Sequence, residues 1–254
     1  MMELFDSHAH YDNERFEGDR DEIIASLESA GIGMVLNAAS DLESSRNALA
    51  LADRYDFFRA SAGVHPHEAS SLNDDVLLEI ERLCGNSRVV ALGEIGLDFY
   101  YDHSPRDVQR TAFERQLTLS KELDIPVIIH SREAAQETFE LVKKYRPRGI
   151  IHCFSGSAEL AEEYVKLGLY VGFTGVVTFP NAKKPLEAAK AAGLGRILIE
   201  TDCPYMAPVP FRGKRCDSTM LPHTAQALTA ALGVSLDTLC EATWENAMTV
   251  YELK

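Results

Sequence analysis

The chain lacks the sequence features of exported, disulfide-stabilised and membrane-spanning proteins. Its five cysteines are odd in number and form no C-x-x-C pair, which favours reduced thiols in a reducing compartment. No apolar run approaches the roughly 18 residues that cross a bilayer, and the start, MMELFD, has neither the basic nor the apolar region of a signal peptide. We therefore expect a cytoplasmic protein with no membrane segment.

Positive charge is also scarce. The 25 Lys and Arg residues against 39 Asp and Glu residues give a net charge of −14, and the only dense basic patch is RGKR at 212–215. This balance argues against broad, non-specific nucleic-acid binding, which needs basic surface to displace counterions. An enzyme that acts on nucleic acid through locally bound cations stays possible, because the ions themselves supply the positive charge.

Apolar, β-branched runs recur along the chain and predict buried parallel strands, because they are continuous rather than alternating. Their expected ends lie near His10, Ala38, His65, Glu94, His130, His152, Thr174 and Asp202. The steps between these ends run from 22 residues (His130 to His152) to 36 residues (Glu94 to His130), about one βα unit each.

Helical patterns lie between most of these runs. They cover residues 19–30, 42–54, 73–84, 105–123, 133–145, 157–167 and 182–192. Eight strands with interleaved helices and no linker predict a single (β/α)8 TIM-type barrel over 1–254, with extra C-terminal helices at 218–232 and 235–251. An open doubly wound sheet is the alternative, which we disfavour because no Gly-rich phosphate loop follows the first run.

The first run, LFDSHAHYD, places Asp6, His8 and His10 at alternate positions. Side chains two apart in a strand share a face, so these three are expected to point the same way. Polar strand ends with solvated histidines would give the same pattern, and the rest of the chain has to separate the two readings.

In a barrel the C-terminal strand ends meet at one mouth, where the active sites of this fold lie. Five of the eight histidines stand at such ends, together with two acidic residues. The expected metal ligands are His8, His10, Glu94, His130, His152 and Asp202. His8 and His10 with a shared carboxylate would hold one ion, and Glu94 is the natural bridge because its two oxygens can each take a metal.

His130 and His152 would complete a second ion beside the first. Asp202 can ligate a metal and also accept a proton from a water. Two divalent ions, Mg²⁺, Mn²⁺ or Zn²⁺, would activate a water on one side and stabilise the leaving oxygen on the other.

Several motifs, in order, resemble those of the TatD family of metal-dependent deoxyribonucleases within the amidohydrolase superfamily. They are FDSHAHYD, GVHPH (63–67), ALGEIGLDFYY (91–101), PVIIHSR (126–132), IHCFSGS (151–157), TFPNAKK (178–184) and ETDCPYMAP (200–208). The resemblance implies the same six ligands and hydrolysis of DNA phosphodiesters, often as a 3′ exonuclease. Glu94, where many superfamily members use a modified lysine, fits this family. The family's usual Asn-Glu-Pro after RGKR is replaced here by Cys216, Asp217 and Ser218, a segment expected to contribute to the substrate channel.

Six further residues are candidates for substrate contact. By resemblance His65 lies near the metals and contacts the substrate phosphate, with a hydrogen-bonded structural histidine as the alternative. Arg212 and Arg215 would bind flanking phosphates, with solvated charge as an equal alternative. The aromatics Phe99, Tyr100 and Tyr101 would stack on an unpaired base or pack under a loop.

The leading functional prediction is a metal-dependent hydrolase of ester bonds, a deoxyribonuclease acting 3′ to 5′ on single-stranded DNA ends. Its expected catalytic residues are Asp202, Glu94 and His65. The second reading is an ester or amide hydrolase of the same superfamily, such as an aminoacyl-tRNA deacylase or a lactonase. A third, a metal-bearing barrel without chemistry, is disfavoured because all six ligand positions are filled. Sequence does not reveal the oligomeric state.

Overall fold

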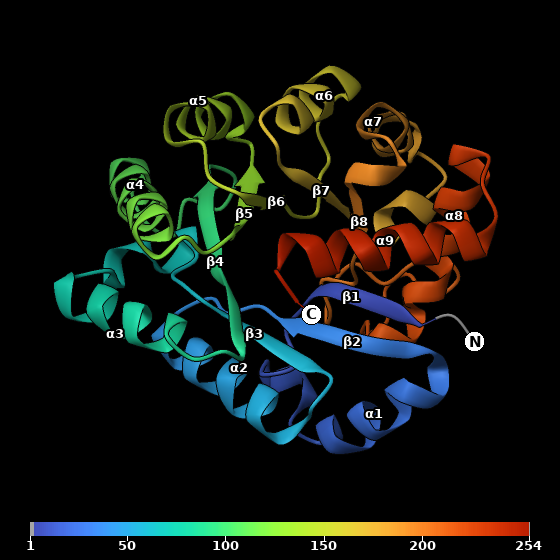
Figure 1. The fold of residues 1–254 in the computed structure, drawn as a ribbon, viewed down its shortest axis with the longest axis horizontal. Coiled ribbons are helices and arrows are strands. Elements are labelled where there is room, and N and C mark those ends of the chain that lie inside the picture. The colour runs from blue at the N-terminus through green and yellow to red at the C-terminus, as the bar shows by residue number, and fades with distance from the viewer. Residues whose placement is uncertain (1–2, 254) are drawn as a thin grey trace. The chain divides into compact units, whose positions relative to one another are not determined.

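The computed structural model describes residues 3–253 and has the (β/α)8 barrel order that the sequence predicts (Figure 1). The strands are β1 (Leu4–Ala9), β2 (Ile32–Asn37), β3 (Phe58–Ala62), β4 (Val89–Asp98), β5 (Val127–Arg132), β6 (Gly149–Ile151), β7 (Tyr170–Phe173) and β8 (Ile197–Ile199). They form one eight-stranded sheet in the order β1 to β8. The predicted fold class, a TIM-type barrel with C-terminal helices, is therefore confirmed.

The helices begin and end close to their predicted bounds. They are α1 (Arg20–Leu27), α2 (Leu42–Arg54), α3 (Asp74–Cys84), α4 (Arg106–Leu123), α5 (Ala135–Tyr145), α6 (Ala158–Lys166), α7 (Lys183–Ala192), α8 (Leu221–Leu232) and α9 (Leu236–Val250). Several begin at side-chain caps: Asp41 accepts the amide of Ser44, and Asn73 accepts that of Val76. The predicted helix at 218–232 begins three residues late, because Ser218–Met220 form a 3-10 turn, η6, capped by Asp217.

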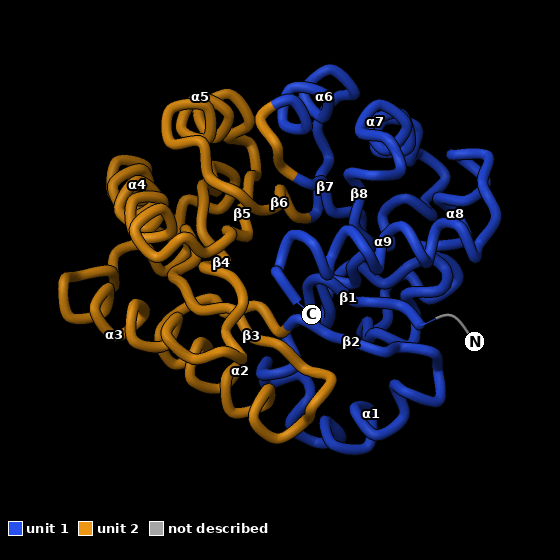
Figure 2. Tube along the Cα trace, in the orientation of Figure 1, with its two compact units in different colours: residues 1–36, 153–166, 170–254 blue, residues 37–152, 167–169 orange. Residues whose placement is uncertain are grey.

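The described chain divides into two compact units, each built from several segments (Figure 2). Unit 1 comprises residues 1–36, 153–166 and 170–254, and unit 2 comprises residues 37–152 and 167–169. The prediction of one domain over 1–254 stays a prediction. No helix within the described residues is both long and apolar enough to cross a membrane.

Within unit 1 the first and last strands of the sheet lie side by side. The amide of Asp202 donates to the carbonyl of His8, and the amide of His10 donates to that of Cys203. The C-terminal helix α9 packs against β1, where Phe5 contacts Trp244 with ring centroids 5.9 Å apart. The ends of β1 and β8 are thereby fixed beside each other.

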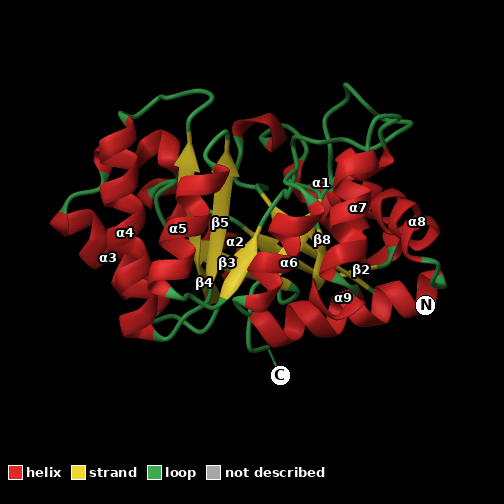
Figure 3. Ribbon diagram, turned by 90° about the horizontal axis from the view of Figure 1, so that it is seen from above, coloured by secondary structure: helices red, strands yellow, loops and turns green. Residues whose placement is uncertain are grey.

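Within unit 2 the strands β3 to β6 pair in parallel, and β4 and β5 run in the same direction in Figure 3. Two buried glutamines of α4 tie the helix to the strand ends. Gln116 accepts the amide of Val64 and donates to its carbonyl, and Gln109 makes the same pair of bonds to Asp98. Each side-chain amide thus satisfies a buried backbone donor and acceptor that would otherwise be costly.

Candidate metal centre

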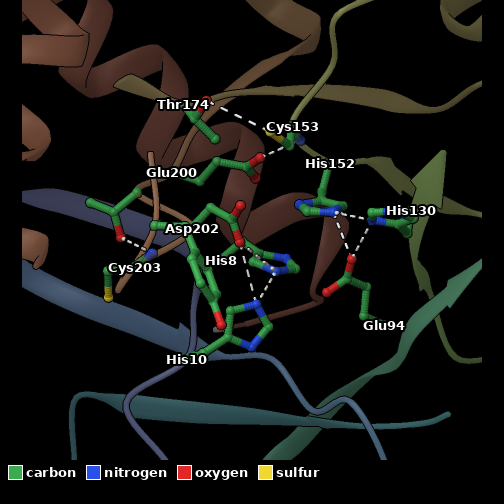
Figure 4. A network of polar contacts seen from close by, with 12 residues as sticks. His8, His10, Glu94, His130, His152, Cys153, Thr174, Glu200, Asp202 and Cys203 are labelled. Atoms are coloured by element: carbon green, nitrogen blue, oxygen red, sulfur yellow. Dashed lines mark hydrogen bonds and ion pairs between the residues drawn. The ribbon is translucent and has the colours of Figure 1, made fainter. Parts of the chain in front are cut away.

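Three predicted ligands meet in unit 1, as Figure 4 shows. His8 Nε2 lies 3.0 Å from His10 Nε2, and Asp202 Oδ1 lies 3.7 Å from the first nitrogen and 3.3 Å from the second. His8 is fully buried, and Asp202 is 8% exposed. The alternation expected for β1 therefore brings both imidazoles onto one face, where they converge with a carboxylate oxygen from beyond β8.

The backbone at the end of β8 aims Asp202 at the two histidines. Asp202 adopts φ 55°, a left-handed conformation that is uncommon outside glycine. Its amide is held by the carbonyl of His8 at 2.9 Å, and its own carbonyl accepts the amide of Tyr205 at 2.9 Å. Such a conformation costs free energy and is typical of functional sites.

Asp6, which the strand pattern also places on that face, serves a different purpose. Its Oδ1 accepts the amide of Thr201, and its Oδ2 accepts the hydroxyls of Thr201 and Ser218, both at 2.6 Å. Burial raises the pKa of Asp6 to about 6, although these hydrogen bonds oppose the shift. Asp6 therefore anchors the end of β8 and does not join the triangle of His8, His10 and Asp202.

The three distances in unit 1 fit a shared cation. Ligands bonded to one ion at about 2.0–2.1 Å lie about 2.9 Å apart at right angles and about 3.4 Å apart at tetrahedral angles. The observed 3.0 and 3.3 Å lie within this range, and the observed 3.7 Å is 0.3 Å longer. Two imidazoles and a carboxylate are also ligand types that Zn²⁺ and Mn²⁺ accept.

The other three predicted ligands meet in unit 2. Glu94 Oε1 lies 2.8 Å from His130 Nδ1 and 2.7 Å from His152 Nε2, and the two nitrogens are 3.4 Å apart. Glu94 is 3% exposed and belongs to β4, while His130 belongs to β5 and His152 follows β6. These separations also match those of ligands around one ion.

Electrostatics keep Glu94 ionised. Burial alone would raise the pKa of its carboxyl, but His152, His65 and His130 outweigh that effect and hold the pKa well below its usual value. His130 shows the reverse: burial would lower its pKa, but Asp98 and Glu94 raise it. A buried, ionised carboxylate among imidazoles is the arrangement that a divalent cation requires.

His65 lies beside the same carboxylate, with its Nε2 at 3.5 Å from Glu94 Oε1. Burial lowers its pKa to about 4 against the opposing effect of Glu94, so the ring is neutral at pH 7. Its Nδ1 accepts the amide of His67 at 3.1 Å, so the single ring proton is on Nε2. His65 therefore offers an N–H donor beside Glu94.

Asp98 and His67 complete the unit 2 cluster, and the sequence reasoning missed Asp98. Asp98 Oδ2 lies 2.9 Å from His67 Nε2 and 3.2 Å from His130 Nε2. Hydrogen bonds from these histidines and from the amide of Tyr101 lower the pKa of Asp98 despite burial. Because an ionised carboxylate only accepts hydrogen bonds, both histidine nitrogens donate to it. A carboxylate behind a metal-binding imidazole fixes its tautomer and orientation. The sequence feature that could have indicated Asp98 is its position four residues after Glu94, which places both carboxylates on the same face of a strand.

Glu200 is a second buried carboxylate that the sequence reasoning did not single out. It is fully buried in unit 1, and its Oε1 accepts the amide of Cys153 (Figure 4). Its Oε2 accepts the hydroxyl of Ser7 at 3.4 Å. Its position two residues before Asp202 is the only sequence signal that could have indicated it.

The two candidate phosphate-binding arginines differ in their surroundings. Arg215 pairs with Asp19 through both of its terminal nitrogens, at 2.8 and 2.5 Å, and lies over the ring of Phe16. Arg212 is exposed, lies 4.5 Å from the ring centroid of Phe179, and has no ion pair among residues 3–253. The guanidinium of Arg212 is thus available to a ligand, whereas that of Arg215 already binds a carboxylate.

The segment expected to contribute to the substrate channel is mostly structural. Cys216 and Ser218 are fully buried, and Ser218 links the hydroxyl of Tyr11 to the carboxylate of Asp6. Asp217 caps η6 by accepting the amide of Thr219. The expectation is therefore wrong for the two side chains that are fully buried, Cys216 and Ser218.

The sequence is similar to those of metal-dependent hydrolases. The profile of the family described as TatD related DNase matches residues 5–252. The uncharacterized metal-dependent hydrolase YabD of Bacillus subtilis is 37% identical over 253 residues, 98% of this chain and 99% of that one. The 3′-5′ ssDNA/RNA exonuclease TatD of Cronobacter sakazakii is 37% identical over 228 residues, 87% of each chain.

A solved structure extends the similarity to three dimensions. The TatD homologue YJJV of Escherichia coli K12 superposes with a TM-score of 0.93 at 30% identity, covering 99% of this chain and 98% of the other. With a family profile and relatives that span nearly its whole length, this chain belongs to the TatD family of metal-dependent hydrolases.

Proposed function

We propose that this hydrolase cleaves phosphodiester bonds at the 3′ ends of single-stranded nucleic acid, with DNA as its substrate. The observation that carries the proposal is the convergence of imidazole nitrogens on a carboxylate oxygen at ligand-like distances in each unit. The name of the Cronobacter sakazakii relative, an exonuclease on ssDNA and RNA, supports the substrate class.

We propose two divalent ions. Unit 1 would hold one of them with His8, His10 and Asp202, and unit 2 would hold the other with Glu94, His130 and His152. The expectation from the sequence that Glu94 is shared by both ions stays a prediction. This grouping rests on the distances within each unit and on strand position. Five of the six residues lie within three residues of a C-terminal strand end, and Glu94 lies inside β4, four residues before its end. When bound, such ions supply an activated water and stabilise the leaving oxygen.

The residues of the chain have separate roles in this proposal. The carboxylate of Asp202, fixed by its left-handed backbone, orients the attacking water and accepts its proton. His65 donates its Nε2–H to a phosphate oxygen, which fits its neutral state. Arg212 binds a flanking phosphate. Arg215 is a weaker candidate for that role because its guanidinium already pairs with Asp19.

The test is a product ladder from 5′-labelled single-stranded DNA, with duplex DNA, RNA, an aminoacyl ester and a lactone in parallel. Each is incubated with protein loaded with Mg²⁺, Mn²⁺ or Zn²⁺. We expect stepwise shortening from the 3′ end, lost in Asp202→Asn and kept in Asp237→Asn, an exposed acidic residue of α9. Turnover of the lactone or ester alone, with no cleavage of DNA or RNA in any metal, would reject the proposal in favour of an ester or amide hydrolase.

A cytoplasmic location remains our prediction from the sequence.

A further inference from the structure

The segment that follows β4 exposes two tyrosines in unit 2. Tyr100 is 60% exposed and Tyr101 is 50% exposed, whereas Phe99 is 9% exposed and packs under Arg106 and Arg110. Of the three aromatics, Phe99 is therefore packed, against two arginines of α4 rather than under a loop. Large exposed aromatic rings that adjoin each other usually mark a binding surface.

A guanidinium accompanies both rings. The Cζ atom of Arg132 lies 4.4 Å from the ring centroid of Tyr100 and 4.8 Å from that of Tyr101. In the parallel sheet the backbone of Arg132 on β5 lies opposite that of Asp98 on β4. Within residues 3–253 the guanidinium of Arg132 contacts these two rings and forms no ion pair, so its positive charge is open to a ligand.

The rings are held in fixed orientations. Tyr100 and Tyr101 stand nearly perpendicular, at 89° with centroids 4.9 Å apart, and Tyr101 stacks on His103 at 10° and 5.6 Å. The amides of both tyrosines donate to Asp98 Oδ1, at 2.9 and 3.0 Å. The other oxygen of Asp98 binds His130, a proposed metal ligand. A single carboxylate therefore joins the aromatic pair to the proposed metal site.

We infer that Tyr100, Tyr101 and Arg132 form a subsite for one unpaired nucleobase and its phosphate, next to the bond that is cleaved. The inference rests on the proposed function. An exposed ring offers a face on which any base stacks, and a guanidinium stacks on bases and binds phosphate as well. The terminal base of a duplex is paired and stacked on its neighbour, so it has to leave its pair before it can enter such a subsite, which therefore favours single-stranded ends.

The test measures binding rather than turnover. A tetranucleotide with phosphorothioate linkages and 2-aminopurine at its 3′ end is titrated with protein in Mg²⁺ at low salt, and quenching of the base fluorescence reports stacking. We expect Tyr100→Leu and Tyr101→Leu each to weaken binding by about 5- to 150-fold, the range of a lost base stack. Tyr100→Phe keeps the ring and should bind as the wild type does.

The matched control is Tyr145→Leu, a tyrosine beside a lysine at the end of α5, just before β6 begins. It should not change binding. A second probe replaces the 3′ base by an abasic site: it should bind the wild type less tightly and should abolish the difference between wild type and the leucine variants. Equal binding of the leucine variants and the wild type, or no effect of the missing base, would overturn the subsite. Failure of the proposed function shows separately, as absence of nucleic-acid cleavage by the wild type.

Discussion

Replacing Asp98 by Asn should weaken metal binding although Asp98 is not itself a proposed ligand. Its Oδ1 accepts two backbone amides, those of Tyr100 and Tyr101, so the oxygen of an asparagine would stay on that side. The new NH2 group would then face His67 Nε2 and His130 Nε2, which now donate at 2.9 and 3.2 Å. Two donors facing each other cannot form a hydrogen bond.

The conflict is relieved if His130 moves its proton to Nδ1. That nitrogen lies 2.8 Å from Glu94 Oε1 and is the one that faces the proposed ion. A protonated Nδ1 cannot ligate, so the variant has to reverse the tautomer before each binding event. Loss of such an outer carboxylate typically lowers metal affinity about 10- to 100-fold, which corresponds to about 1.4–2.7 kcal/mol.

The assay is competition for Zn²⁺ between the protein and a chromophoric chelator, with ¹⁵N NMR of the histidine rings to record the tautomer. The control is Asp102→Asn, an exposed residue of the same segment with φ 51° that pairs with Arg106. It should bind metal as the wild type does. A zinc affinity within twofold of wild type for Asp98→Asn, with the His130 proton still on Nε2, would refute this account of Asp98.

Three further predictions follow from the described contacts. Glu94→Gln should remove nearly all turnover and lower the number of bound ions, measured by product formation and metal analysis; wild-type-like cleavage would reject its role. Gln109→Leu should lower the free energy of unfolding by about 2–4 kcal/mol because the bonds of Gln109 to Asp98 and Ser104 are lost. Urea unfolding beside exposed Gln136→Leu checks this, and equal midpoints would contradict it. Removing metal with a chelator should lower Tm by about 5–10 °C for each ion, if the ion was present at about 100 times its Kd. Scanning calorimetry should show that added Mn²⁺ restores the original Tm. An unchanged Tm would count against a bound ion.

The order of strands and helices could be predicted because burial on both faces leaves a continuous apolar run in the sequence. The runs ending near His10 and His130 correspond to β1 and β5, which end within two residues of those positions. Agreement was weaker for β4, which continues from Glu94 to Asp98. The apolar run is interrupted by the charged residue Glu94, so the sequence predicts an end to the strand there.

The candidate ligands were also accessible to sequence reasoning, because a parallel barrel brings strand ends to one edge. The supporting contacts were not. Arg215 pairs with Asp19 across 196 residues and Ser218 with Asp6 across 212. Such pairs join single polar residues and leave no periodic signal. Sequence alone therefore could not distinguish Arg212, which is open to a ligand, from Arg215, which is not.

The central claim is that these side chains bind two divalent cations, and the most direct measurement is the number of ions per chain. Equilibrium dialysis against Mn²⁺, followed by elemental analysis, should give two ions for the wild type and fewer for both His10→Ala and His130→Ala, one from each unit. A wild-type protein that retains no ion, or the same count in all three proteins, would contradict the claim.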